Sequence, residues 1–510
     1  MGRRAVAPAN RGWEMNARVL IVGAGPVGLF VGTELAKYGI AADIIEKNNG
    51  GNSYSKALSV SAASLKAFHG LGLQEEFAGR GKPIQEIAVH FNGKRCARID
   101  KRKLGGLYDY YLSVPQPETE SLIRLALERA NGKVDYGHEL TQLEQDANGV
   151  SVAIRDAASG QLVNRHYEMV IGCDGAQSSV RQLLKMPFEG YDYDVHFIMG
   201  DVYFDGAVES EMTSYHVYDE GFLIFLPMDN GLTRLVVSKP GPLPANRPAP
   251  DQEELQFFLD KYYPRPLRIK QVIWSSSARF FNRLAASNHV GRVFLAGDAF
   301  HLFSPIGGQG MNTGIQDAAN LGWKIAFYLK GAAKPELLQS YRRERYVAVG
   351  KAADLTGANT ELILRRGGAE HMRWRYTPAM SNRAFYRRRL SHDFSGLLAD
   401  HNIESSSLVG RHVPYCARSD GLLGLQSTYD IPKLGRNVLF CNDGVADAAR
   451  ARLERYLHVV ATGGLADDDH AWRAALHLDR HDACLVRPDG YVGFCGSLDE
   501  LEQYLDRLYH

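Results

Sequence analysis

The architecture of this chain follows from one stretch near its start, Arg18-Val-Leu-Ile-Val-Gly23-Ala-Gly25-Pro26-Val-Gly28. Its short apolar run is typical of a buried parallel strand. Apolar residues at helical spacing follow up to Tyr38, and a second strand-like run covers residues 40–46. This succession of strand, glycine turn, helix and strand predicts one βαβ unit.

The glycine turn has the spacing of a dinucleotide-binding site. Gly23 permits the tight turn, Gly25 lets a pyrophosphate approach the backbone, and Gly28 allows helix and strand to pack closely. A helix that begins at Pro26 offers free N–H groups and a partial positive charge to a diphosphate. Glu46 ends the second strand, where a carboxylate can bind a ribose 2′-hydroxyl. We expect a bound dinucleotide, and the alternative is a tight turn without a ligand.

Composition excludes several other classes of protein. The 510 residues include 59 Lys and Arg against 58 Asp and Glu, so no basic excess predicts a nucleic-acid partner. No apolar run reaches the length of about 18 residues that predicts a membrane span, and the N-terminal stretch lacks the apolar centre of a secretion signal. Six cysteines without a Cys-x-x-Cys pair or metal-ligand spacing predict reduced thiols, a cytoplasmic location and no metal site.

Two more glycine–aspartate turns follow strand-like runs. The first is Asp174-Gly175, with Arg181 after it, and the second is Gly297-Asp298, followed by a glycine-rich segment over 304–314. Together with the first turn, these motifs resemble those of the class A flavoprotein aromatic hydroxylases, the para-hydroxybenzoate hydroxylase and phenol hydroxylase type. The stretch Leu485-Val-Arg-Pro-Asp-Gly-Tyr-Val resembles the thioredoxin-like tail of the longer members, which act on phenols, polyketides and phenylpropionates.

The resemblance implies an α/β fold in three parts. An antiparallel β-sheet substrate domain is inserted into a Rossmann-like FAD-binding domain, and a thioredoxin-like α/β domain without a redox cysteine pair follows. The implied limits are 17–190 and 286–400 for the FAD-binding domain, with part of 85–115 joining the substrate region, 191–285 for the substrate domain, and 405–510 for the C-terminal domain.

The resemblance also implies a reaction. FAD, with NADPH or NADH as co-substrate, would use O2 to hydroxylate a phenol or another electron-rich ring through a flavin C4a-hydroperoxide. Alternatives within the family are the hydroxylating release of a nitro or halo substituent and the tailoring of a polyketide. Outside it stand a flavin halogenase, whose Trp-x-Trp-x-Ile-Pro string is absent from the sequence, and a non-catalytic flavin-binding protein. The expected partners are a small aromatic substrate and O2, and a homodimer is left open.

The motifs and the resemblance together give a cofactor site. Asp298 would bond the ribityl chain, Gln116 would touch the flavin, and Asp174 and Arg181 would serve the FAD/NAD(P)H region. Relatives often have arginine where Lys56 stands, and lysine keeps the charge but loses the bidentate fork. The predicted cofactor contacts are Gly23, Gly25, Pro26, Gly28, Glu46, Lys47, Lys56, Gln116, Asp174, Gly175, Arg181, Gly297, Asp298, Pro305, Gly308, Gly310, Met311 and Asn312.

The substrate side depends on the resemblance and on aromatic strands expected to cover the flavin. Pro305 would lie beside the oxygen-bearing face of the ring, and Tyr215 or His216 would draw off the phenolic proton. For His301, beside the Gly-Asp turn, a structural role is favoured over that of a base. Plain sheet core is the alternative for the aromatic strand residues. The predicted substrate contacts are Tyr215, Phe222, Phe225, Phe303, Pro305, Ile306 and Gly307.

Overall fold

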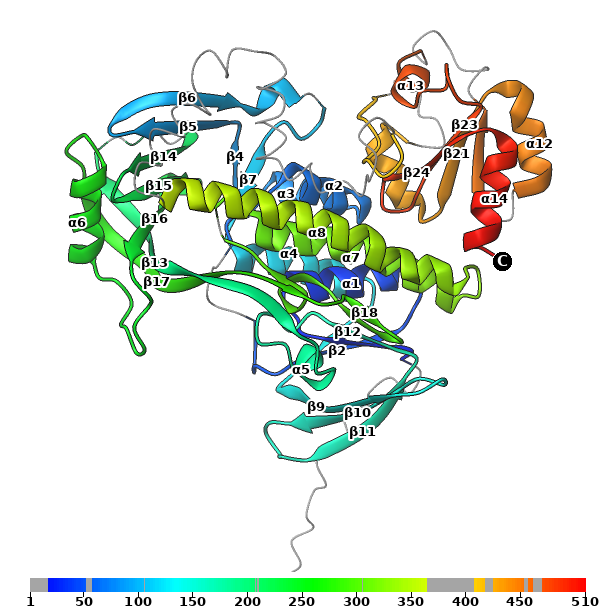
Figure 1. The fold of residues 1–510 in the computed structure, drawn as a ribbon, viewed down its shortest axis with the longest axis horizontal. Coiled ribbons are helices and arrows are strands. Elements are labelled where there is room, and N and C mark those ends of the chain that lie inside the picture. Colours follow the sequence, from blue (N-terminus) through cyan, green and yellow to red (C-terminus); the bar gives the residue numbers. More distant parts are fainter. Residues whose placement is uncertain are drawn as a thin grey trace, which may run out of the picture.

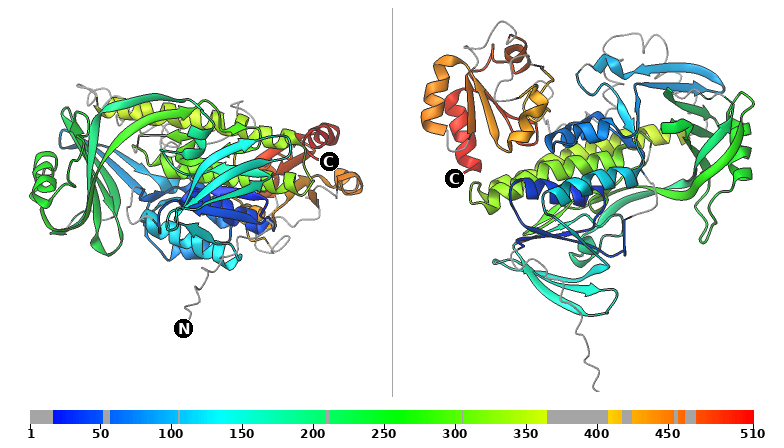
Figure 2. Two further views of the ribbon diagram at one scale, coloured as in Figure 1. Left: turned by 90° about the horizontal axis from the view of Figure 1, so that it is seen from below. Right: turned by 180° about the vertical axis from the view of Figure 1, so that it is seen from behind.

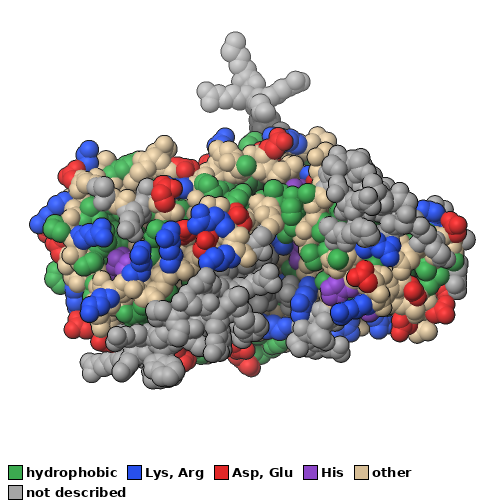
Figure 3. Space-filling view, turned by 90° about the horizontal axis from the view of Figure 1, so that it is seen from above, with side chains coloured by type: hydrophobic (Ala, Val, Ile, Leu, Met, Phe, Trp, Pro, Cys, Tyr) green, Lys and Arg blue, Asp and Glu red, His purple; other side chains and the backbone are tan. Residues whose placement is uncertain are grey.

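The computed structural model describes residues 17–51, 57–104, 106–206, 208, 211–304, 306–364, 408–417, 425–453, 457–461 and 470–510. Sheets of six, eight and four strands each organise one part of the molecule, and two three-stranded sheets complete the fold (Figure 1). The described helices include none that is long and apolar enough to cross a membrane. Side chains of both charges are interspersed on the face seen in Figure 3.

The six-stranded sheet forms the core of the N-terminal part, in the order β18-β19-β12-β1-β2-β8, and only the edge strand β18 is antiparallel to its neighbour. Its strands are β1 (Val19–Val22), β2 (Ala42–Glu46), β8 (Val134–Tyr136), β12 (Met169–Gly172), β18 (His289–Val290) and β19 (Val293–Leu295). All four residues of β1 are buried, as expected for a strand covered on both faces. This sheet confirms the predicted βαβ unit.

The two faces of this sheet have different covers because neighbouring side chains of a strand point to opposite sides. Val19 and Ile21 pack against helices on one face. Leu20 and Val22 pack on the other face, against the three-stranded sheet of β9, β10 and β11. The helices are α1 (Pro26–Lys37), α2 (Ala62–Gly70), α3 (Gln74–Ala78), α4 (Gln116–Arg129), α7 (Gln309–Leu329) and α8 (Pro335–Leu364). The opposite cover consists of β9 (His138–Gln145), β10 (Val150–Asp156), β11 (Leu162–Tyr167) and α5 (Ser179–Leu183).

The eight-stranded sheet has the order β20-β17-β13-β16-β15-β14-β5-β6 and is antiparallel except between β14 and β5. Its strands are β5 (Glu86–Phe91), β6 (Lys94–Asp100), β13 (Phe188–Asp205), β14 (Met212–Tyr218), β15 (Gly221–Pro227), β16 (Thr233–Pro240), β17 (Arg268–Ala285) and β20 (His301–Leu302). Helix α6 (Gln252–Tyr262) covers one face. A small sheet of β3 (Ser59–Val60), β7 (Tyr111–Ser113) and β4 (Lys82–Ile84) lies between the two large sheets in sequence and in space (Figure 1).

The C-terminal part has a four-stranded sheet in the order β22-β21-β23-β24, with β21 and β22 parallel and the other pairs antiparallel. Its elements are β21 (Asn437–Cys441), α12 (Asp443–Leu453), β22 (Leu457–Ala461), α13 (His470–Ala475), β23 (Ala483–Val486), β24 (Val492–Gly496) and α14 (Leu498–Leu508). A βαβ unit is thus followed by a ββα unit, and the thioredoxin-like character of this domain stays a prediction. The domain lies beside the helical layer in each view, and α8 runs from the eight-stranded sheet towards it (Figures 1 and 2).

Candidate active site

One cavity of about 990 Å³ joins the glycine turn to the eight-stranded sheet. Its walls come from the turn before α1, the ends of β2 and β12, the loop before α7, and the strands β13 to β17. In parallel α/β sheets, ligands bind at the carboxyl ends of the strands, and three of these walls lie there. Segments almost 290 residues apart in the sequence therefore meet around one space, as between Ala24 and Asn312.

The three glycines of the first turn have different surroundings. A Cβ atom on Gly23 would lie 2.4 Å from the Cys173 carbonyl oxygen, and one on Gly28 would lie 2.0 Å from the Gly23 carbonyl oxygen. A Cβ atom on Gly25 would meet nothing within 4 Å, because this glycine faces the cavity. Helix α1 begins beside it without a side-chain cap, so its first N–H groups are available to a diphosphate.

Glu46 and Lys47 line the same end of the cavity. The Glu46 carboxylate accepts hydrogen bonds from the Ala24 N–H, at 3.1 Å, and from the Asn48 side-chain amide, at 2.6 Å. These bonds orient the carboxylate beside the glycine turn while leaving acceptor capacity for a ribose hydroxyl.

Asp174 and Gly175 also line the cavity, but Arg181 does not. One Asp174 carboxylate oxygen accepts from the Val180 N–H at 3.1 Å, and the other is buried without a partner among the described residues. Burial raises the pKa of this carboxyl group, so an added hydrogen-bond donor would stabilise it. The unpartnered oxygen fits a cofactor hydroxyl.

Arg181 lies behind the wall. Its guanidinium group donates to the carbonyl oxygens of Ala299, at 2.9 Å, and Ala176, at 2.7 Å, and stacks on the Phe188 ring at 3.8 Å. These hydrogen bonds direct the guanidinium group to the protein backbone, and its predicted role at the cofactor stays a prediction. Arg181 ties the turn of Asp174 to the turn that follows Asp298.

The buried carboxylate of Asp317 binds the second Gly-Asp turn, Gly297-Asp298, on the side away from the cavity. Asp298 is exposed to the cavity, whereas the residues on either side of it are buried. Asp317 accepts from the Gly297 N–H at 3.0 Å, from His301 Nε2 at 2.7 Å and from Arg345 Nε at 2.7 Å. Burial alone would raise the pKa of Asp317, but the charges of Arg345 and His301 hold it below its ordinary value. His301 is thus bonded within the wall and does not line the cavity.

The loop before α7 and the first turn of α7 contribute another wall, through Ile306, Gly307 and Gly308 of the loop and Gly310, Met311 and Asn312 of the helix. Gly308, with φ 64°, precedes the first residue of α7 and provides no side-chain cap, so the helix N-terminus is open. Helix α7 begins at Gln309. Asn312 anchors the loop, accepting from the Ser61 N–H at 2.8 Å and donating to the Ser59 carbonyl at 2.8 Å.

Gln116, the first residue of α4, also lines the cavity. Its side-chain oxygen accepts from the Ala57 N–H at 3.1 Å, and its amide donates to Glu120 at 2.8 Å. The predicted residues Lys56 and Pro305 lie outside the described residues, and their roles stay predictions.

The eight-stranded sheet presents two cross-strand rows to the cavity. The first is largely apolar and joins Ser276, Met199, Val236, Ile224 and Tyr215. The second joins Trp274, Asp201, Arg234 and Leu226, of which all but Asp201 line the cavity. Phe303, a predicted substrate contact, lines the same cavity. The sheet therefore builds a chamber wall that is apolar in one row and polar in the next.

Strand alternation places other predicted residues away from the chamber. His216 stacks on His90 with ring centres 4.5 Å apart, and burial lowers its pKa to about 3. Phe225 packs in the cluster beneath α6, and Phe222 is fully buried in the sheet core without lining the cavity. His216 and Phe225 each lie on the face of their strand opposite to the cavity-lining neighbours Tyr215 and Ile224. Phe222 instead shares a face with Ile224 and packs behind the chamber wall with Met199 and Val236. The substrate and proton-transfer roles of these three residues stay predictions.

Several chamber residues were not predicted from the sequence. Arg234 is 1% exposed and binds Asp201 through both Nε, at 2.7 Å, and Nη2, at 2.9 Å. Its guanidinium carbon lies 4.8 Å from the centre of the Trp274 ring. Tyr111 and Thr213 line the cavity and are hydrogen-bonded to each other. The one available signal was a pair of charged residues, Asp201 and Arg234, next to the short apolar runs Phe197–Met199 and Leu235–Val237.

The donor set around the cavity fits FAD. An open glycine beside a free helix N-terminus suits the diphosphate, Glu46 suits the ribose, and Asp298 suits a hydroxyl chain. The second free helix N-terminus, that of α7, suits partial negative charge on the isoalloxazine ring. The described residues contain no cluster of His, Cys, Asp and Glu that could hold a metal ion.

Comparisons with known proteins give the same answer. An FAD binding domain model matches residues 16–356, and a model of the C-terminal domain of aromatic-ring hydroxylases matches residues 406–509. The solved structure of anhydrotetracycline hydroxylase from Streptomyces rimosus has a TM-score of 0.79 and 28% identity, covering 96% of this chain and 98% of that one.

Two relatives illustrate the range of similarity. The 6-methylpretetramide 4-monooxygenase of Streptomyces rimosus is 30% identical, over 94% of this chain and 91% of that protein. The pentachlorophenol 4-monooxygenase of Sphingobium chlorophenolicum is 32% identical, over 70% of this chain and 66% of that protein. The predicted cofactor and reaction class are confirmed: this chain belongs to the FAD-dependent aromatic-ring hydroxylases, which are NAD(P)H-using monooxygenases.

Proposed function

We propose that the chain hydroxylates a fused-ring phenol of the polyketide type. The observation that carries this proposal is one continuous cavity, which extends from the first glycine turn to a wall that includes residues of seven strands of the eight-stranded sheet. The names of two relatives that match over both domains support a fused-ring substrate, since one refers to anhydrotetracycline. A substituted one-ring phenol is the second candidate, supported by the pentachlorophenol enzyme over a shorter match.

FAD, when bound, supplies the activation of O2. One oxygen atom would enter a ring C–H bond as a hydroxyl group, the other would leave as water, and NAD(P)H would provide the two electrons. The chain's own part is to orient the ring, exclude water and handle the phenolic proton. The apolar row of Met199, Val236 and Ile224 would hold the ring face.

Hydroxyl groups in the wall are candidates for the phenolic proton. Tyr215 and the bonded pair Tyr111–Thr213 all line the cavity. Burial raises the pKa of Tyr111 well above its ordinary value, so its hydroxyl stays protonated at neutral pH and acts as a donor or relay. Of the predicted catalytic residues on the sheet, Tyr215 is retained in this proposal.

Arg234 and Trp274 would orient a substrate oxygen. Arg234 Nη1 and Trp274 Nε1 are buried and have no hydrogen-bond partner among the described residues. An unpaired buried donor is costly, so a carbonyl or phenol oxygen of a bound ring would stabilise both. Asp201 already balances the charge of Arg234, which favours a neutral oxygen over a carboxylate.

A substrate panel tests the proposal. Purified holoenzyme is given fused-ring phenols and one-ring phenols of matched acidity, and NAD(P)H oxidation, peroxide release and product mass under ¹⁸O2 are followed. We expect stimulated oxidation with one labelled oxygen in the fused-ring product. Stimulation and product only with one-ring phenols would replace the fused-ring substrate class by the one-ring class.

A cytoplasmic location, the absence of nucleic-acid and membrane partners, and the domain limits stay predictions from the sequence.

A further inference from the structure

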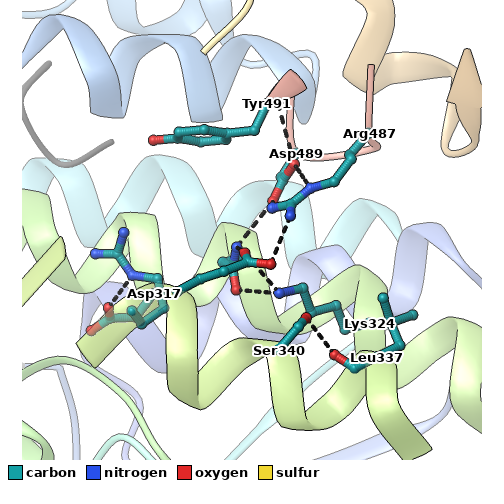
Figure 4. A network of polar contacts seen from close by, with 10 residues as sticks. Asp317, Lys324, Leu337, Ser340, Arg487, Asp489 and Tyr491 are labelled. Carbon is teal, nitrogen blue, oxygen red and sulfur yellow. Dashed lines mark hydrogen bonds and ion pairs between the residues drawn. The ribbon is translucent and has the colours of Figure 1, made fainter. Parts of the chain in front are cut away.

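The turn between β23 and β24 connects the C-terminal domain to α7 and α8 through a polar network (Figure 4). Arg487 donates from Nη1 to Glu344 on α8, at 2.8 Å, and from Nε to Asp489 in its own turn, at 3.1 Å. Lys324 on α7 donates to the other Glu344 oxygen at 2.9 Å. Asn320, also on α7, donates to Asp489 at 3.2 Å.

The charges of this network are buried and balanced. Two cations, Arg487 and Lys324, face two carboxylates, Glu344 and Asp489, and each side chain is at most 16% exposed. A buried charge that loses its partner is strongly unfavourable, so the network tolerates little displacement of one element against another. The C-terminal domain is thus held to both helices in a defined position.

A second contact between the C-terminal domain and α7 lies one helical turn closer to the N-terminus of α7. The Tyr491 hydroxyl donates to Gln316 Oε1 on α7 at 3.1 Å, and this tyrosine is 5% exposed. The next residue of α7 is Asp317, which accepts from the Gly297 N–H and from His301.

The same pairing of neighbours occurs on α8. Glu344 binds the C-terminal domain, and the adjacent Arg345 binds Asp317 at 2.7 Å. In each helix, therefore, one residue binds the C-terminal domain. Its neighbour in the sequence binds the Gly-Asp turn, directly in the case of Asp317 and through Asp317 in the case of Arg345. A shift of either helix on loss of the domain would move Asp317 and, with it, the turn of Asp298.

We propose that the C-terminal domain is a positioning part of the FAD site, acting through Arg487, Asp489 and Tyr491 on α7 and α8. None of these three residues lines the cavity, so they act through Gln316, Glu344 and their neighbours. This role differs from that of a separate stabilising or dimerisation module, and it does not depend on the identity of the substrate.

The test compares full-length variants that lose similar contacts in different places. Tyr491→Phe removes only the hydroxyl that binds Gln316. Tyr509→Phe is the matched control, because its hydroxyl accepts from Asn437 at 3.0 Å inside the C-terminal domain. FAD affinity of the apoprotein is measured by flavin fluorescence, and hydrogen exchange is measured over residues 309–317.

We expect Tyr491→Phe to weaken FAD binding about fivefold, the equivalent of one hydrogen bond, and to speed exchange at the start of α7. Arg487→Met should have a larger effect, and Tyr509→Phe should leave both readouts at the parental values. If Tyr491→Phe and Tyr509→Phe lower the melting temperature alike while FAD affinity and exchange stay parental, the domain is only stabilising and the proposal is overturned. Tyr491→Phe alone decides the matter if Arg487→Met does not fold.

Discussion

In the first glycine turn, glycine is needed for two different reasons: close packing of the backbone and access of the ligand. Gly23 and Gly28 leave no space for a Cβ atom because backbone carbonyls lie within 2.4 Å and 2.0 Å of its position. Gly25 has open space, so its lack of a side chain benefits only the ligand. The surroundings of the three glycines agree with the separate roles that the motif predicts, two for folding and one for binding.

This difference predicts opposite effects for two alanine substitutions. Gly25→Ala should leave the melting temperature of the apoprotein unchanged and weaken FAD binding by at least about tenfold, because the methyl group occupies the path of the diphosphate. Gly28→Ala should destabilise the apoprotein itself. Gly350→Ala, on α8 with nothing within 4 Å of an added Cβ, is the control for both readouts. Normal FAD affinity in Gly25→Ala would contradict the assigned cofactor path.

At the scale of elements, the eight-stranded sheet separates chamber from core by alternation. On β15, Ile224 and Leu226 line the cavity, and Phe225 between them packs beneath α6. On β14, Thr213 and Tyr215 line it, and His216 does not. Aromatic content alone cannot distinguish these sets, because both faces of the sheet are covered.

Substitutions on opposite faces of β15 should therefore affect substrate binding and stability separately. Ile224→Trp should fill the chamber and raise the KM for a fused-ring phenol by about tenfold or more, with FAD affinity retained. Phe225→Leu should lower the free energy of unfolding by about 1–3 kcal/mol and leave KM near the parental value. Steady-state kinetics and urea unfolding measure the two quantities. An unchanged KM in Ile224→Trp would remove this wall from the substrate site.

At the scale of the whole molecule, separate contacts join the C-terminal domain to the FAD-binding part. Besides the Arg487 network, Asp430 accepts from His69 Nε2 of α2 at 2.8 Å and from Lys433 at 2.7 Å. Burial of Asp430 opposes its charge, but Lys433 and His69 together lower its pKa to about 2 from an ordinary 3.8. Burial is also the main reason for the lowered pKa of His69.

This junction predicts an acid-dependent loss of stability. A carboxylate with a lowered pKa stabilises the folded state above its ordinary pKa, and the contribution disappears as the pH falls through the folded value. The urea midpoint of the parent should exceed that of Asp430→Asn at pH 6, and the difference should shrink between about pH 4 and pH 2. A difference that stays constant over this range would show that the junction does not depend on the Asp430 charge.

The sequence by itself determined the βαβ unit, because it depends on local glycine and carboxylate spacing that one stretch of chain contains. The FAD cofactor and the reaction class followed from the resemblance of three separate motifs to those of a known family. Only the tertiary structure decided that Arg181 supports the wall, that His216 faces away from the chamber, and that Arg234 and Trp274 face it. Such choices depend on which side of a sheet is enclosed and on contacts between residues hundreds of positions apart. Tyr491 and Gln316 meet across 175 residues for the same reason, and no local pattern records that meeting.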